Sequence, residues 1–388
     1  MRDIGIYVHI PFCKKKCSYC DFVSYENKTE KIEEYIKYIK KEIYQTAEGA
    51  RKDIECKLIK PFRINTIYIG GGTPSYIDSK HIVAIVDLIK KEFEIDKDIE
   101  ITIELNPGTV DKQKLLDYKN IGINRLSIGV QSNNDNLLIS IGRIHNYNEF
   151  LDTYTLARKI GFENINLDFI IGLPNQKMED IDNLIIEIKK LSPEHISIYS
   201  LMLEENTKMF EKYKNNSLEL PDENMERQMY WKLKNSLEKN GYIHYEISNF
   251  AKKGCESRHN LACWNQEEYM GFGVAAHSYT DGARYSNIDN IDEYINNFKN
   301  NKDIENIIFH EKQNIEMKMK EYMFLGFRKI QGINIDEFYN KFKKDVFDVF
   351  SDELSRLIDI NLIQINDNNI KLTNKGIDLA NLVFEEFC

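Results

Sequence analysis

Short apolar segments alternate with longer amphipathic segments along the first 240 residues. The short segments predict strands at Ile4–His9, Thr66–Ile69, Ile99–Asn106, Arg125–Gln131, Asn164–Ile171 and Ile196–Met202. The segments between them have helical spacing and predict helices such as Glu30–Ala47, Ser79–Phe93, Asp111–Ile121 and Glu179–Leu191. This alternation is typical of parallel strands joined by crossover helices.

The predicted strands have one apolar and one polar face. Between the apolar residues of the segment 99–106 stand Glu100, Thr102, Glu104 and Asn106, and the segments 125–131 and 164–171 alternate in the same way. Successive side chains of a strand point to opposite faces, so we expect helices to cover the apolar faces and the polar faces to line a common interior. Closed eight-stranded barrels fill their interior with branched apolar side chains. The pattern therefore favours an α/β fold with an open six-unit (β/α) partial TIM-type barrel. A sheet with one solvated polar face is the alternative.

The composition of the sequence changes after about residue 281, where Asn and Lys become frequent. We therefore predict a partial barrel over residues 1–245, a connecting segment over 246–305, and a C-terminal domain over 306–388. The tail predicts a helix ending at Phe327, helices at Asp336–Phe342 and Phe350–Ile360, a hairpin at Asn361–Leu372, and a final helix. This order is winged-helix-like. Residues 311–388 carry 11 Lys plus Arg against 14 Asp plus Glu, a net charge of −3, which favours a packing module over a nucleic-acid binder.

Composition excludes several classes of protein. Of the 388 residues 42% are hydrophobic, enough for a sizeable core, and the net charge of −10 argues against general nucleic-acid binding. No apolar stretch approaches the ~18 residues of a membrane span, and the first residues lack the layout of a signal peptide. Seven cysteines, three of them clustered, do not form a disulfide framework. We expect a cytoplasmic protein for which any membrane contact would require a partner.

The clustered cysteines predict a metal centre. Cys13, Cys17 and Cys20 follow the first predicted strand at spacings of four and three residues. Thiolates select zinc or iron–sulfur clusters. Structural zinc takes four protein ligands, and His9 is the one conceivable fourth ligand here. Three cysteines on a four-iron cluster would instead leave one iron open for an external ligand, and we favour this [4Fe–4S] reading.

The segment HIPFCKKKCSYCDF, residues 9–22, resembles the radical S-adenosylmethionine superfamily, with CxxxCxxC after a first strand and Tyr19 before the third cysteine. It is similar in particular to the family of oxygen-independent coproporphyrinogen III oxidases and related heme chaperones. The resemblance covers essentially the whole chain, including LTNKG around Gly376. It implies a [4Fe–4S] cluster on the three cysteines and S-adenosylmethionine on the open iron. The cofactor contacts that it implies are Tyr7, Tyr19, Gly71, Gly72, Thr73, Glu104, Gln131, Arg143 and Asp168.

The residues themselves are compatible with these roles. The run Gly70–Pro74 closes the second predicted strand, where bare backbone could approach a ligand, although such a run alone is more often only a turn. Glu104 and Asp168 lie near the carboxyl ends of predicted strands, where barrel sites form. Carboxylates suit ribose hydroxyls and ammonium groups, and Arg143 suits the carboxylate of the cofactor.

Two functions within the family share this scaffold. A coproporphyrinogen III dehydrogenase would take hydrogens from propionate side chains and release carbon dioxide, whereas a chaperone binds heme and passes it to acceptor proteins. Phe22 stands where the dehydrogenases have a further cysteine, and the first cluster cysteine is already residue 13. We therefore expect the chaperone, without coproporphyrinogen dehydrogenase activity. A radical enzyme with another substrate, or a module with a structural cluster, is the third class. Turnover of S-adenosylmethionine and the identity of the heme acceptor stay open.

The segment RHNLACW, Arg258–Trp264, resembles the HNxxYW heme-binding motif of the family's chaperones, with Cys263 in place of Tyr. We expect His259 to be an axial ligand or an immediate neighbour of heme, and Trp264 to offer a flat apolar surface. Cys263 would share a helix face with His259, so the two could not ligate from opposite sides of the porphyrin.

Two further candidates follow this motif. His277 could lie at the cofactor or heme pocket or be a hydrogen-bonded core histidine. The run Gly271–Ala276 mimics a dinucleotide-binding fingerprint, which we reject because NQEEYM before it is not an apolar strand.

Overall fold

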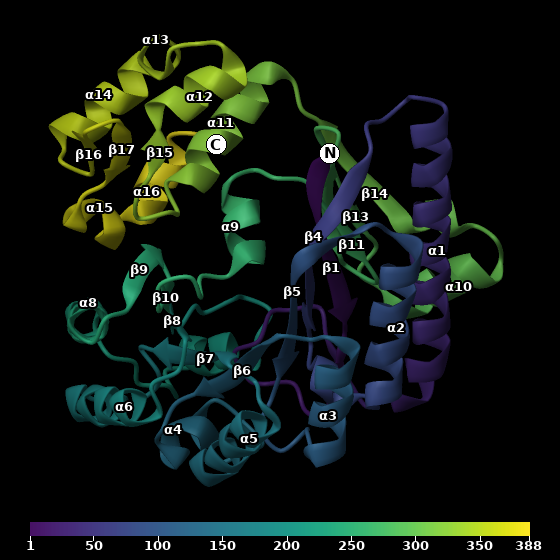
Figure 1. Ribbon diagram of the computed structural model, residues 1–388. Coiled ribbons are helices and arrows are strands. Elements are labelled where there is room, and N and C mark those ends of the chain that lie inside the picture. Colours follow the sequence, from purple (N-terminus) through teal and green to yellow (C-terminus); the bar gives the residue numbers. More distant parts are fainter.

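The computed structural model describes residues 1–388, and its centre is a curved sheet of parallel strands (Figure 1). The six strands expected from the sequence are neighbours in chain order: β1 (Arg2–Ile10), β4 (Phe62–Gly71), β5 (Ile95–Leu105), β6 (Arg125–Gln131), β7 (Asn164–Ile171) and β8 (His195–Ser200). The open six-unit partial barrel is thereby confirmed. Two short strands, β2 (Phe12–Cys13) and β3 (Tyr25–Glu26), pair beside it.

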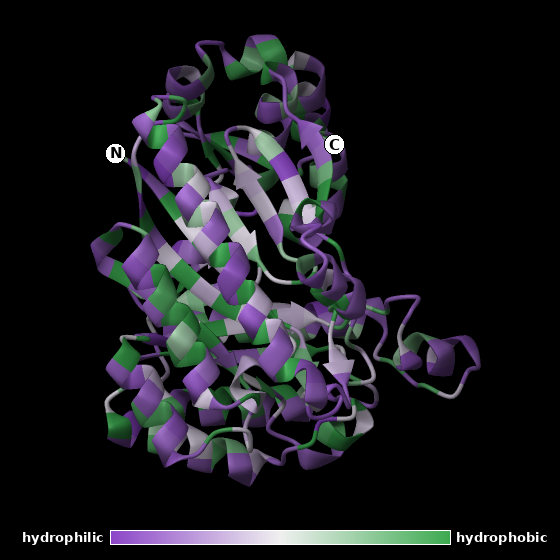
Figure 2. Ribbon diagram, turned by 90° about the vertical axis from the view of Figure 1, so that its right-hand side faces the viewer, coloured by the Kyte–Doolittle hydropathy of each residue, from purple (hydrophilic) through white to green (hydrophobic).

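Helices cover the outer face of this sheet, and hydrophilic residues occupy much of their outer surface (Figure 2). They are α1 (Ile32–Glu55), α2 (Ser79–Glu92), α3 (Lys112–Ile121), α5 (Tyr147–Ile160), α6 (Met178–Leu191) and α8 (Glu223–Lys239). The short helices α4 (Asp135–Ser140) and α7 (Lys208–Lys214) lie instead beside the cysteine loop, where Met209 N–H donates to the Ser18 carbonyl at 2.9 Å and Leu137 shares a small buried cluster with Met209. The strand residues that face them belong to a core of 56 buried residues, in which Ile103 and Leu167 are fully buried. On the opposite face Thr102, Arg125 and Asn166 are also at most 2% exposed. At these positions the polar faces line a common interior, as predicted, and the alternative of a sheet with one solvated polar face is wrong.

Further strands extend the barrel sheet at both ends. They are β9 (Ile243–Glu246), β10 (Asn249–Ala251), β11 (Tyr269–Phe272), β12 (His277–Thr280), β13 (Ala283–Asn287) and β14 (Ile307–Lys312). β11 pairs parallel with β1, and β12 to β14 continue from it as antiparallel strands. The segment 246–305, which the sequence set apart as a connection, thus supplies β10 to β13 of the main sheet. This pairing joins Gly5 to Tyr269, which are far apart in the sequence. Short-range periodicity carries no information about contacts between such distant residues.

Helix α9 (Arg258–Trp264) lies within the curve of the sheet, below the C-terminal domain in Figure 1. The carboxylate of Glu100 accepts hydrogen bonds from the backbone N–H groups of Arg258 and His259 at 3.1 and 3.2 Å. A carboxylate at a helix N-terminus satisfies free N–H groups and interacts favourably with the helix dipole. Because His259 also contacts Gly5 and Thr66, α9 closes the interior near the amino-terminal ends of β1 and β4.

The C-terminal domain has its own core of 19 buried residues. Its elements are α11 (Ile315–Gly326), β15 (Ile333–Asn334), α12 (Ile335–Phe342), α13 (Val346–Val349), α14 (Ser351–Asp359), β16 (Ile363–Asn366), β17 (Asn369–Leu372), α15 (Asn374–Asp378) and α16 (Ala380–Glu385). The predicted helices and hairpin are present, and the final helix is divided into α15 and α16. Helix α10 (Ile291–Lys299) packs beside α1. No helix has the length and apolar character to cross a membrane.

Candidate functional site at the carboxyl end of the barrel

The cysteine loop follows β1 directly. Cys13 ends β2 and is buried, whereas Cys17 and Cys20 are partly exposed, and all three are free thiols. The loop is anchored by the backbone of Ser18, whose N–H donates to the carbonyl of Ile141 at 3.1 Å. Burial raises the pKa of the Cys13 and Cys20 thiols, so a metal or cluster would have to displace their protons.

The arrangement of the thiols fits a cluster better than a single metal ion. No three side chains among His, Cys, Asp and Glu come close enough together to hold one ion. The imidazole of His9 is occupied on both sides, because its Nδ1 lies 2.9 Å from the Tyr7 hydroxyl and its Nε2 lies 2.8 Å from the Val23 carbonyl. The one fourth ligand that we considered for zinc is therefore engaged elsewhere. A four-iron cluster distributes its thiolates over separate iron atoms, so its ligands need not converge on one point.

A chain of hydrogen bonds connects the cysteine loop to the strand ends. Thr73 Oγ1 donates to Cys13 Sγ at 3.5 Å, and Asn106 Nδ2 donates to Thr73 Oγ1 at 2.9 Å. Arg143 continues the chain, since its Nη2 donates to Asn106 Oδ1 at 2.6 Å and its Nη1 donates to Cys17 Sγ at 3.6 Å. Sequence reasoning did not assign Asn106 to the site. Asn106 lies on the same polar strand face as Glu104, two residues later, and this position could have indicated that it belongs to the site.

The glycine run approaches the cysteine loop as closely as a backbone can. A Cβ atom on Gly72 would lie 3.0 Å from Cys13 Sγ and from the backbone of Pro11 and Phe12. Gly71 has a φ of +112°, and a Cβ there would lie 2.6 Å from the His9 ring. Both positions therefore require glycine, as expected where backbone must approach another group.

Two carboxyl groups face the interior from neighbouring parts of the sheet. Glu104 accepts hydrogen bonds from the Tyr68 hydroxyl at 2.8 Å and from the Gly71 N–H at 3.1 Å, and burial raises its pKa to about 7. Asp168 accepts from Asn166 Nδ2 at 2.7 Å and from Ser127 Oγ at 3.1 Å, and burial also raises its pKa. Both carboxyls are held by neutral donors, which leaves them free to pair with a cationic ligand.

The structure brings the cofactor residues expected from the sequence to one end of the barrel. They come from β1, the cysteine loop, the carboxyl-terminal parts of β4 to β7 and the turn between α4 and α5, which carries Arg143. Gln131 ends β6 with a φ of +67°. Those that are partly exposed are Tyr7, Tyr19, Gly71, Gly72, Glu104, Gln131, Arg143 and Asp168. Thr73 is buried, and the buried Nε of Arg143 has no hydrogen-bond partner. A polar ligand among these accessible groups is one explanation for the unsatisfied guanidinium nitrogen.

His259 is separated from this set by Tyr68, whose hydroxyl donates to Glu104. Its Nδ1 is 2.9 Å from Thr66 Oγ1, its ring stacks on Tyr68 with centroids 5.3 Å apart, and the residue is 7% exposed. Burial lowers its pKa to about 4. Trp264 leaves α9 on another side, where the guanidinium of Arg328 lies 4.4 Å from its ring centre. His259 and Trp264 therefore have different surroundings, and the predicted role of His259 at heme stays a prediction.

The remaining candidates are also placed by the fold. Burial raises the pKa of Cys263 to about 12. His277 is exposed, so the alternative of a core histidine is wrong. Of NQEEYM only Tyr269 and Met270 belong to a strand, β11, and a turn into β12 follows it instead of a helix. The dinucleotide fingerprint therefore stays rejected, and the missing helix is a second reason.

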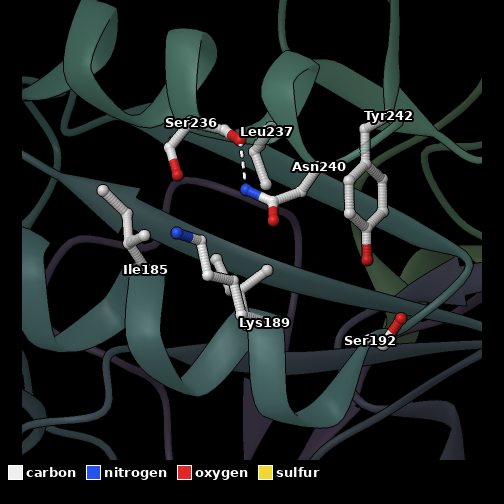
Figure 3. A pocket seen from close by; sticks show the side chains of 8 residues that line it. Ile185, Lys189, Ser192, Ser236, Leu237, Asn240 and Tyr242 are labelled. Carbon is white, nitrogen blue, oxygen red and sulfur yellow. Dashed lines mark hydrogen bonds between the residues drawn. The ribbon is translucent and has the colours of Figure 1, made fainter.

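A pocket between α6 and α8 lies apart from these residues (Figure 3). Ile185, Lys189, Leu237 and Tyr242 are among its lining residues, and Asn240 donates to the Ser236 carbonyl at 2.6 Å. It contains none of the predicted site residues.

The chain is similar to known proteins over nearly its whole length. Residues 7–188 match the Radical SAM superfamily, and residues 316–379 match the HemN C-terminal domain. The chain is 36% identical to the heme chaperone HemW of Lactococcus lactis subsp. lactis (strain IL1403), over 98% of this chain and 96% of that protein. It is also 36% identical to the heme chaperone HemW of Bacillus subtilis (strain 168), over 98% of both. The fold is that of the coproporphyrinogen III oxidase HemN from Escherichia coli, with a TM-score of 0.84 at 21% identity, over 100% of this chain and 90% of that chain.

Proposed function

Because this chain belongs to the family of heme chaperones HemW within the radical S-adenosylmethionine superfamily, we propose that it binds heme and transfers it to acceptor proteins. We further propose that it carries a [4Fe–4S] cluster and S-adenosylmethionine on the partial barrel. The hydrogen-bond chain from Cys13 through Thr73 and Asn106 to Arg143 and Cys17 is the observation that carries the cofactor assignment. It couples the cysteine loop directly to residues suited to a polar cofactor.

In this proposal Cys13, Cys17 and Cys20 hold the cluster and leave one iron free. The cluster, when bound, supplies the electron for reductive cleavage of S-adenosylmethionine. The Gly71–Thr73 backbone and Glu104 bind the methionyl amino group, and Arg143 binds the methionyl carboxylate.

Further residues of the site bind the rest of the cofactor. In this proposal Asp168 accepts hydrogen bonds from the ribose hydroxyls, and Gln131 and Tyr19 also contact the cofactor. The Arg143 guanidinium stabilises the Cys17 thiolate, to which it already donates a hydrogen bond. Tyr7 and Tyr68, whose rings stack with centroids 6.3 Å apart, cover the floor of the site against water.

The alternative function is oxygen-independent coproporphyrinogen III dehydrogenase. The whole-chain likeness to HemN concerns the fold and does not distinguish the two. Phe22 favours the chaperone, because it replaces the cysteine that the dehydrogenases carry after the cluster motif and is 70% exposed. We propose a cytoplasmic location, acceptor proteins as partners and no nucleic-acid partner.

The test uses anaerobically reconstituted protein and the variant Cys13→Ala/Cys17→Ala/Cys20→Ala. Wild type should contain iron and acid-labile sulfide with visible cluster absorption, and the variant should lose all three. Heme should bind to the wild type with a shifted Soret band, whereas coproporphyrinogen should not be decarboxylated. Zinc with negligible sulfide in the wild type would contradict the cluster, and turnover of coproporphyrinogen without heme binding would establish the dehydrogenase.

A further inference from the structure

Two arginine side chains of this protein have no hydrogen-bond partner. The Nε atoms of Arg125 and Arg328 are buried and unpaired, and neither guanidinium takes part in a hydrogen bond or an ion pair with the protein. Every other arginine of the chain donates at least one side-chain hydrogen bond. A buried guanidinium without a partner is unfavourable, and an anionic ligand would supply the acceptors that the protein does not.

Arg125 points into the barrel from the first residue of β6 and is 2% exposed. In the strand register it lies between Thr102 of β5 and Asn164 of β7, and the buried Thr102 Oγ1 and Asn164 Oδ1 also have no partner. Thr102 is in register with Tyr68, on whose ring His259 stacks. Arg125 therefore lies on the side of α9 that carries His259, and its charge adds to burial in lowering the pKa of His259 to about 4.

Arg328 approaches α9 from the C-terminal domain, two residues after α11. Its guanidinium carbon lies 4.4 Å from the ring centre of Trp264 and 5.6 Å from that of Phe384. A guanidinium stacks on aromatic rings through its faces, which leaves the N–H groups along its edge free to donate. Glu246 is an acidic neighbour, but burial raises the pKa of this carboxyl to about 7, although the charge of Arg328 opposes the shift. Glu246 is therefore only a partial counter-charge for Arg328.

The two arginines border the segment that is expected to hold heme. Helix α9 lies between the barrel strands and the C-terminal domain (Figure 1), with His259 as its second residue and Trp264 as its last. Arg125 is on the side of His259, and Arg328 is on the side of Trp264. Heme carries two propionate groups, each of which ends in a carboxylate. The planar fork of a guanidinium matches a carboxylate with two parallel hydrogen bonds.

The inner face of the barrel is accessible from the end of β8. Tyr199 is 43% exposed and lies two residues after Ser197, the register partner of Asp168. Burial lowers the pKa of Arg328, and the neighbouring Glu246 and Tyr199 oppose this shift, so the exposed Tyr199 also borders Arg328. The carboxylate of S-adenosylmethionine is a weaker candidate for these arginines. In the proposed function it belongs to Arg143, which a hydrogen bond joins to Cys17 of the cysteine loop.

We propose that Arg125 and Arg328 bind the two propionate carboxylates of heme at α9, Arg125 from the barrel and Arg328 from the C-terminal domain. This inference rests on the proposed heme-chaperone function and deepens it. It gives the C-terminal domain a direct contact with the bound heme.

The experiment compares ferric heme with its dimethyl ester, which has the same iron and macrocycle but no propionate charge. Each is titrated into the full-length protein with its cluster reconstituted, and the Soret band is recorded. The proteins are wild type, Arg125→Gln, Arg328→Gln and, as the matched control, Arg227→Gln, which removes an arginine already paired with Asp378. Wild type and Arg227→Gln should bind heme roughly tenfold or more tightly than the ester. Arg125→Gln and Arg328→Gln should each bind heme roughly tenfold more weakly, with the ester affinity unchanged.

Thermal unfolding separates ligand binding from a structural role. Arg125→Met removes the unpaired charge and keeps a side chain of similar length. Without heme this variant should unfold at the wild-type temperature or above it, and heme should raise its midpoint less than that of the wild type. A lower midpoint without heme would mean that Arg125 stabilises the fold, and it would contradict the inference.

The titrations can also overturn the proposal. A wild-type preference for heme over the ester in Arg125→Gln or Arg328→Gln would remove that arginine from the site. Equal affinity of the wild type for heme and the ester would show that no propionate is recognised, while the chaperone function would stand. Absence of heme binding by the wild type would instead refute the chaperone function itself. Circular dichroism and iron content of each variant show whether the fold and the cluster are intact.

Discussion

Glu104 allows the proposed cofactor site to be tested through pH. Burial raises the pKa of this carboxyl to about 7, although Tyr68 and the Gly71 N–H donate hydrogen bonds that stabilise the charged form. If Glu104 binds the amino group of S-adenosylmethionine, only its ionised form pairs with the ammonium charge. Raising the pH through 7 ionises the carboxyl, so the affinity for the cofactor should increase with pH.

The size of the effect follows from the pKa. For a pKa of about 7, roughly a tenth of the carboxyls are ionised at pH 6 and roughly three quarters at pH 7.5, so affinity should rise about eightfold. The interval stops at pH 7.5 because α-amino groups themselves lose a proton near pH 8. The isosteric Glu104→Gln removes the charge. A charge-assisted hydrogen bond contributes about 1.5–3 kcal/mol, so this variant should bind roughly ten- to hundredfold more weakly at pH 7.5.

The assay is equilibrium dialysis of labelled S-adenosylmethionine under anaerobic conditions, with cluster absorption recorded at each pH. Wild-type affinity should rise with pH, and that of Glu104→Gln should stay flat. Asp168→Asn is the control, because it should weaken binding yet keep the part of the pH dependence that Glu104 contributes. An equal rise with pH in wild type and Glu104→Gln would refute the assignment of the amino group to Glu104.

Two further substitutions test the contacts between the strands and the cysteine loop. In Gly72→Ala the added Cβ would lie 3.0 Å from Cys13 Sγ, so the iron and sulfide content should fall while the circular dichroism spectrum is unchanged. Full iron content would show that the cysteine loop can shift to accommodate the methyl group. Asn106→Ala removes the link between Thr73 and Arg143 and should weaken S-adenosylmethionine binding roughly tenfold at constant iron content. Wild-type affinity in Asn106→Ala would mean that Arg143 is positioned without this amide.

Local patterns determined the elements of this protein well. The bounds expected for the fourth and fifth strands agree with β6 (Arg125–Gln131) and β7 (Asn164–Ile171), because alternation with a period of two is written in neighbouring residues. The polar interior followed from the same alternation. The cysteine spacing was equally local, since a loop of eight residues carries all three thiols.

Only the tertiary structure decided which distant segments meet. The pairing of β1 with β11 and the chain from Thr73 through Asn106 to Arg143 join residues far apart in the sequence. The same holds for the histidines. A motif drew attention to His259, but packing against Thr66 and Tyr68 buries it, whereas His277 is left exposed. Exposure depends on every element that packs around a side chain, and the residues adjacent to it in the chain do not contain that information.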